Sequence, residues 1–209
     1  MKHLSILLLA GLLIVSSAFV PVTEPLYPEL LQSFKQLKKS TPISNDRQDD
    51  LGGIQQLGIV AKGQKHPVLV ELMSNDGFSA PIAKAVLKAA MAANGITDVK
   101  VFIVGTPAID KVAPVLNKLG FKVGSDGAKY NDQSGSITFE STPSNPQAIH
   151  VLLNENAATL LTNPDKFAVK LKYPSLAAGS TDEQYQQQAN LITAEMLFVV
   201  ARIKDNWKF

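Results

Sequence analysis

The sequence predicts an α/β domain: a three-layer, doubly wound, mainly parallel four-stranded sheet with helices on both faces, preceded by an N-terminal helical extension. Two observations predict this fold. Apolar runs typical of buried strands occupy residues 67–73, 99–104, 148–153 and 168–173. Helical spacing of apolar residues is found at 80–94, 111–119 and 181–204. Strands that alternate with helices along a chain are typical of parallel sheets.

Capping residues predict where these helices begin. Ser79 is expected to cap the helix at 80–94, and Asp110 the helix after it. Ser180 and Glu183 have the spacing of a capping box for the last helix. The polar, glycine-rich stretch 121–140 predicts a hairpin around residues 131–135.

Two amphipathic helices are expected before the sheet, at residues 26–39 and 45–60. Their apolar faces favour packing onto the following domain over a role as a separate interaction arm. The chain is therefore divided into an extension at 19–65 and an α/β domain at 66–209.

Residues 1–18 have the pattern of a signal peptide. Lys2 precedes an apolar run at 4–15, and Ser16 and Ala18 supply small residues for cleavage after Ala18. We therefore expect an exported protein, periplasmic or secreted, without membrane attachment after cleavage. The alternative is a retained anchor, but a spanning helix needs about 20 apolar residues, and Pro21 interrupts the run.

Composition excludes several classes of function. The 209 residues contain no cysteine, which excludes thiolate catalysis, disulfides and cysteine metal sites. The three histidines are too scattered to suggest a metal, and no cofactor is expected. The net charge of +2 and the lack of a basic cluster argue against a nucleic-acid partner.

The candidate ligand loop lies at the end of the first strand, where open parallel sheets bind their ligands. A glycine-containing loop there, followed by a helix N-terminus, presents backbone N–H groups to anions. The loop consists of Leu72, Met73, Ser74, Asn75, Asp76, Gly77, Phe78 and Ser79.

Residues 68–79 resemble the phosphate loop of the low-molecular-weight tyrosine phosphatase and arsenate reductase family. That loop follows an apolar strand and carries a Cys, an Asn, an Arg and then a Ser at the head of a helix. Asn75 and Ser79 match its Asn and Ser, and further matches occur at 104–106 and 119–121. Two further segments are similar to a longer bacterial branch of phosphatases. They are the start of the first helix, at 26–28, and the end of the last helix, at 192–198. The resemblance covers roughly residues 26–204.

The catalytic residues that the resemblance implies are missing. Leu72 stands at the position of the nucleophilic Cys, Phe78 at that of the Arg, and Tyr173 at that of the Asp that acts as general acid. We therefore expect no catalytic residues and no phosphatase or arsenate reductase activity. Asp76 would repel a bound dianion, and Phe78 would fill the cavity that the Arg leaves.

Two classes of function remain open. The first is a binding or structural module with an unidentified protein or small-molecule partner. The second is a hydrolase acting on a phosphate ester or another small anion through a rebuilt site, with Ser74 or Ser79 as nucleophile and His66 or His150 as base. A loop closed by Phe78 and Met73 would favour the first, and an open pocket with a Ser–His contact the second.

Overall fold

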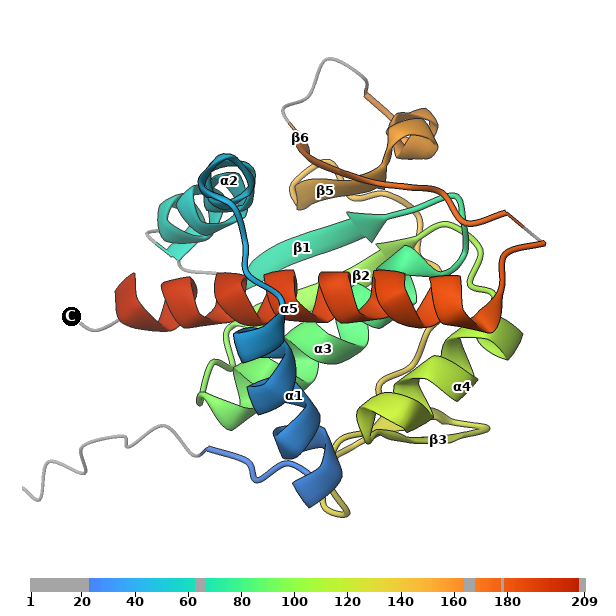
Figure 1. Ribbon diagram of the computed structural model, residues 1–209. Helices are drawn as coiled ribbons and strands as arrows, with labels where there is room; N and C mark the ends of the chain where they lie inside the picture. Colours follow the sequence, from blue (N-terminus) through green and yellow to red (C-terminus); the bar gives the residue numbers. More distant parts are fainter. Residues whose placement is uncertain (1–22, 63–66, 164–167, 178, 207–209) are drawn as a thin grey trace, which may run out of the picture.

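The computed structural model describes residues 23–62, 67–163, 168–177 and 179–206, with the backbone alone described at 55–62 and 206. At the centre of these residues lies a sheet of β1 (Val68–Met73), β2 (Val99–Val104), β5 (Ile149–Asn154) and β6 (Ala168–Tyr173). All four strands are parallel, and they lie in the order β2-β1-β5-β6 (Figure 1). The predicted fold class is confirmed, and β1 is an inner strand.

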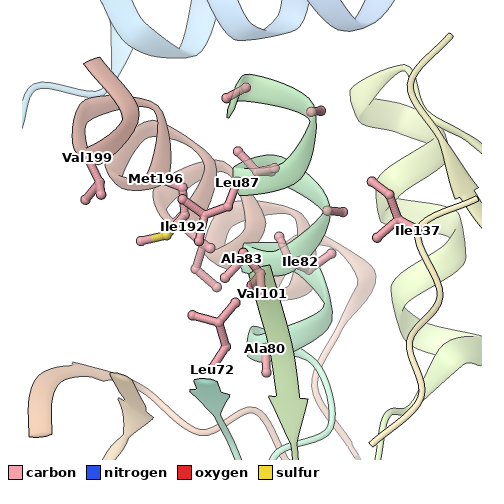
Figure 2. Close-up of a cluster of buried hydrophobic side chains, with 14 of the residues drawn as sticks. Leu72, Ala80, Ile82, Ala83, Leu87, Val101, Ile137, Ile192, Met196 and Val199 are labelled. Carbon is pink, nitrogen blue, oxygen red and sulfur yellow. The ribbon is translucent and has the colours of Figure 1, made fainter. Parts of the chain in front are cut away.

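The larger part of the core lies between one face of the sheet and two helices, α3 (Ser79–Ala93) and α5 (Asp182–Asn206). Successive side chains of a strand point to opposite faces. Leu72 of β1 and Val101 of β2 therefore share one face, and they lie in one apolar cluster with Ala83 of α3 and Ile192 of α5 (Figure 2). Alanines recur along α3 and leave room for the larger side chains of α5.

The other face of the sheet carries a smaller cluster. Met73, Val104 and Leu152 meet Ala157, which belongs to the short 3₁₀ helix η1 (Glu155–Leu160). This helix lies between β5 and β6 in the chain. Helices therefore lie on both faces of the sheet, as the alternating pattern predicts.

Two helices precede the sheet, α1 (Pro28–Ser40) and α2 (Asn45–Lys62). Their apolar residues Leu30, Phe34, Leu51 and Ile54 are buried in the same core cluster as the sheet. Figure 1 shows α2 beside the sheet and α1 beside α5. Pro28 at the first position of α1 suits a helix start, where its missing N–H costs no hydrogen bond.

The connection from β2 to β5 contains α4 (Ile109–Leu119) and a hairpin of β3 (Lys122–Gly124) and β4 (Gly127–Lys129). The regular hairpin thus lies before the predicted position around 131–135. At that position the chain forms a loop closed by one antiparallel bridge between Ala128 and Ile137. The side-chain oxygen of Asn131 accepts the backbone N–H groups of Gln133 and Ser134, which bends the chain away from a strand.

The predicted helix caps are wrong in detail. Ser79 is the first residue inside α3, and Asp110 lies in the first turn of α4, so neither side chain caps its own helix. The capping box of α5 is formed by Thr181 and Gln184, one residue later than the predicted pair. Capping depends on backbone angles at the helix entry, which local composition does not determine.

The expected signal peptide, residues 1–18, lies outside the described residues. Within the described part of the chain, no helix combines the length and apolar character that a bilayer span requires.

Candidate functional site

The candidate loop, residues 72–79, leaves the carboxyl end of β1 and leads into α3 (Figure 1). The backbone N–H of Ser74 still continues the sheet, because it donates to the Val104 carbonyl at 3.2 Å. The chain then turns at Gly77, whose φ is 67°. A Cβ there would lie 2.7 Å from the backbone oxygen of Thr106, so glycine is needed. The Gly77 carbonyl accepts the Ala108 N–H at 2.8 Å, which fixes the two neighbouring loops to each other.

The backbone N–H groups at the start of α3 are satisfied by side chains of the loop itself. Asp76 Oδ1 accepts the N–H groups of Phe78 and Ser79, both at 3.0 Å. Asp76 Oδ2 accepts the Ser79 hydroxyl at 2.6 Å, and Ser74 Oγ accepts the Ala80 N–H at 3.2 Å. A carboxylate at this place also complements the positive end of the helix dipole. The loop therefore carries its own anion where an external one would bind.

Both hydroxyl groups of the loop are closed off from solvent. Ser74 is 1% and Ser79 0% exposed. The Ser79 oxygen also accepts an N–H from the Gln188 side chain of α5 at 2.9 Å. Among the described residues, neither the Ser74 nor the Ser79 hydroxyl forms a hydrogen bond with a histidine. His66 lies outside the described residues. The Ser–His pair of the second hypothesis is therefore not found in the described part of the chain.

His150 has a different set of partners. In β5 it lies beside Glu71 of β1, and its Nε2 is 3.2 Å from Glu71 Oε2 and 3.1 Å from the Asn145 carbonyl. Glu71 also accepts the Ser144 hydroxyl at 3.0 Å and the Asn145 N–H at 2.6 Å. This buried group ties the segment before β5 to the sheet, which explains the two polar side chains within apolar strands.

Most of the remaining loop residues are packed into the core. Leu72, at the position of the nucleophile, is 1% exposed, and Met73 is buried on the opposite face. Phe78, at the position of the Arg, is 0% exposed, and its ring lies edge-on to the Tyr185 ring with centroids 4.9 Å apart. Asn75 is exposed to solvent. Apolar side chains therefore close the loop on its core side, and the Asn75 amide is the group that it presents to solvent.

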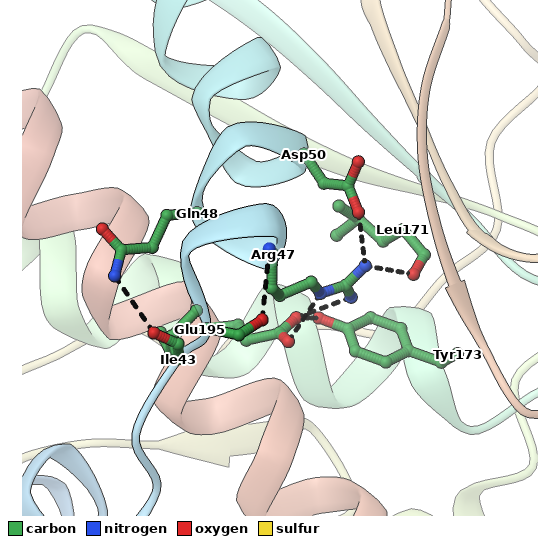
Figure 3. A network of polar contacts seen from close by, with 8 residues as sticks. Ile43, Arg47, Gln48, Asp50, Leu171, Tyr173 and Glu195 are labelled. Carbon is green, nitrogen blue, oxygen red and sulfur yellow. Dashed lines mark hydrogen bonds and ion pairs between the residues drawn. The ribbon is translucent and has the colours of Figure 1, made fainter.

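Tyr173, at the position of the general acid, belongs to a buried polar network (Figure 3). Its hydroxyl donates to Glu195 of α5. Arg47 of α2 donates to both oxygens of the same carboxylate, at 2.7 and 2.8 Å, and to the Leu171 carbonyl at 2.6 Å. Burial, followed by the charge of Glu195, raises the pKa of Tyr173 well above its usual value. Tyr173 therefore remains a neutral phenol that holds α2, β6 and α5 together.

Within the described residues, no group of three or more histidines and carboxylates could hold a metal ion. Comparison with family models, curated proteins and solved structures gave no match. The likeness of residues 26–204 to the phosphatase and reductase family stays a hypothesis from the sequence.

Two groups escaped the sequence-based predictions. One is the network of Arg47, Tyr173 and Glu195, whose members are far apart in the chain. The other is Lys84, which is buried on α3 beside a surface groove. A signal for Lys84 does exist in the sequence, because a lone lysine interrupts the apolar run of residues 80–87.

Proposed function

We propose that this chain is an exported, catalytically inactive relative of the low-molecular-weight phosphatases and acts as a binding or structural module. One observation carries the proposal: the Asp76 carboxylate occupies the N–H groups of Phe78 and Ser79 at the head of α3. An anionic substrate would have to displace this carboxylate or bind beside it.

Charge magnitudes favour exclusion of anions from the loop. A helix N-terminus attracts an anion by about 0.3–1 kcal/mol, and by at most about 2. An anion about 6 Å from the Asp76 carboxylate would be repelled by roughly 3 kcal/mol per unit charge at an effective dielectric constant of about 20. A dianion would experience about twice that repulsion. Repulsion exceeds attraction, and Phe78 supplies no cation to offset it.

The alternative of a rebuilt hydrolase gains no support from the hydroxyl groups. A serine nucleophile needs a base within hydrogen-bond reach and access to substrate. Ser74 and Ser79 are buried, and their oxygens bond to backbone amides, Asp76 and Gln188.

A phosphatase assay tests the inactive state. We expect no hydrolysis of p-nitrophenyl phosphate or of a phosphotyrosine peptide by the purified chain. Ser79→Ala is compared with Ser175→Ala, which changes an exposed serine. Turnover that is lost in Ser79→Ala and kept in Ser175→Ala would contradict the proposal, because it would assign catalysis to the loop.

Export is tested separately by intact-mass measurement of the protein recovered outside the cytoplasm. Residues 1–18 should be missing from its mass. A mass that includes Met1 to Ala18 would show that the leader is retained.

A further inference from the structure

A groove of about 570 Å³ lies at the free edge of the sheet, outside β2. Its walls are α3, the edge of β2 and the segment 136–142. Its volume is within the range of about 300–1,000 Å³ that small-molecule sites occupy. The groove is formed by other residues than the loop at 72–79, and the proposal below does not depend on the function of that loop.

The edge of β2 offers backbone donors to the groove. The Val68 N–H donates to the Asp98 carbonyl, and the Ser74 N–H donates to the Val104 carbonyl. The backbone N–H and C=O groups of even-numbered residues along β2 therefore point toward β1. The odd-numbered groups face outward. The Ile103 carbonyl accepts the Thr142 N–H at 2.9 Å. Among the described residues, the outward N–H and C=O groups of Val101 have no backbone partner.

Lys84 is the buried cation of the groove. It is 7% exposed and lies on the stripe of α3 that also brings Lys88 and Met91 to the groove. Its ammonium has no hydrogen bond and no ion pair within the described part of the chain, and Glu140 attracts it only through space. Burial, with a contribution from Lys88, lowers the pKa of Lys84 to about 8. Partial burial without a partner penalises the charged form of Lys84, and a bound carboxylate would supply the missing counter-charge.

The charges around the groove complement one negative charge. Three lysines line it, at positions 84, 88 and 100, against Glu24 and Glu140, so the sum is 3 − 2 = +1. Glu24 already accepts the Tyr130 hydroxyl at 2.7 Å, which leaves it less available to a lysine. Apolar surface comes from Met91, Ile96 and Val99 on the side of the sheet that packs on α3.

We propose that this groove binds a small organic monocarboxylate, with its carboxylate at Lys84 and the Val101 N–H and its apolar body against Met91, Ile96 and Val99. A dianion such as phosphate fits less well, because Glu140 lies in the same groove and the net charge is a single positive one. The occupant has the size of an aromatic or short aliphatic acid.

The first test is an NMR titration of the isotope-labelled chain with phenylacetate, octanoate, neutral phenylacetamide and inorganic phosphate. At least one carboxylate should bind with a dissociation constant below about 1 mM and shift the amide signals of Lys84, Val101 and Phe102. Phenylacetamide and phosphate should bind at least about tenfold more weakly than that carboxylate. Absence of carboxylate binding up to about 10 mM, or equal binding of amide or phosphate, would overturn the proposal.

The second test is Lys84→Gln with Lys118→Gln as the matched control, since Lys118 is exposed on α4. Lys84→Gln should weaken carboxylate binding at least about tenfold, and Lys118→Gln should leave it unchanged. Unchanged affinity in Lys84→Gln would overturn the assignment.

The pH dependence of the unaltered chain tests the same group without a substitution. The titratable groups that line the groove with Lys84 are Lys88 on α3, Lys100 on β2, Glu140 on the segment 136–142, Glu24 and Tyr130, and of these Lys88 and Glu140 act on the Lys84 charge. Burial lowers the pKa of Lys84 to about 8, so its positive charge is lost as the pH rises through that value. Carboxylate affinity should therefore fall between about pH 7 and pH 9, and a constant affinity over this range would contradict the proposal.

Discussion

Arg47→Met tests the polar network that joins α2 to α5 and β6. In the unaltered chain the guanidinium donates to Glu195 at 2.7 and 2.8 Å and to the Leu171 carbonyl at 2.6 Å. The variant leaves the Glu195 carboxylate, 2% exposed, with the Tyr173 hydroxyl as a donor but without its counter-charge. Removing one partner of a buried ion pair costs about 3–5 kcal/mol. Because the Arg47 side chain is 20% exposed, we expect a smaller loss of about 2–4 kcal/mol.

Urea denaturation measures this loss as a lower midpoint at a similar slope. Lys118→Met, which removes an exposed lysine from α4, is the control and should change the free energy of unfolding by less than about 0.5 kcal/mol. The double variant Arg47→Met with Glu195→Leu removes both charges and should lose less than the sum of the single variants, with a coupling of about 1 kcal/mol or more. A loss below about 1 kcal/mol for Arg47→Met, or strict additivity, would refute the reasoning.

Three further predictions concern the loop and the groove. Phe78→Ala should lower the free energy of unfolding by about 3–5 kcal/mol, because the ring is fully buried, whereas Leu31→Ala at a 41% exposed position should change it by less than about 0.5 kcal/mol in denaturation experiments. Gly77→Ala should destabilise by about 2 kcal/mol or more through its positive φ and the contact with a backbone oxygen, and Gly52→Ala, in open space on α2, should stabilise by about 0.5–1 kcal/mol; equal effects would contradict this account. Burial lowers the pKa of Lys84 to about 8, so its charge destabilises the folded state below that pH. Lys84→Met should therefore be more stable than the unaltered chain by about 1 kcal/mol at neutral pH, a value reduced for the partial access of water to the groove. The difference should disappear as the pH rises from about 8 to 10.5, and a difference that grows with pH would exclude this explanation.

The strands and helices could be predicted from the sequence because their signals are local. The apolar run of β1 and the helical spacing of α3 each lie within one short window. The position of the loop follows from these two elements. The direction of the Asp76 side chain does not, because it depends on the turn at Gly77 and on the neighbouring loop that contacts that glycine.

Contacts between distant parts of the chain could not be predicted. Arg47 and Glu195 are separated by 148 positions, and no periodicity relates them. Lys84 is a similar case: α3 alone would leave a lysine free to reach solvent, but the segment 136–142 and the β2 edge border the same groove. Burial there is a property of the assembled fold.

The most direct test of the central claim is calorimetric titration of the purified chain with phosphate, arsenate and vanadate. Asp76→Ala and Asp76→Asn are titrated in parallel: alanine frees the N–H groups of Phe78 and Ser79, whereas asparagine retains an acceptor without the charge. The account predicts no binding tighter than about 1 mM to the unaltered chain, and tighter binding to Asp76→Ala than to either of the other two proteins. A dissociation constant below about 1 mM for the unaltered chain, equivalent to about 4 kcal/mol of affinity, would contradict the closed, self-occupied loop.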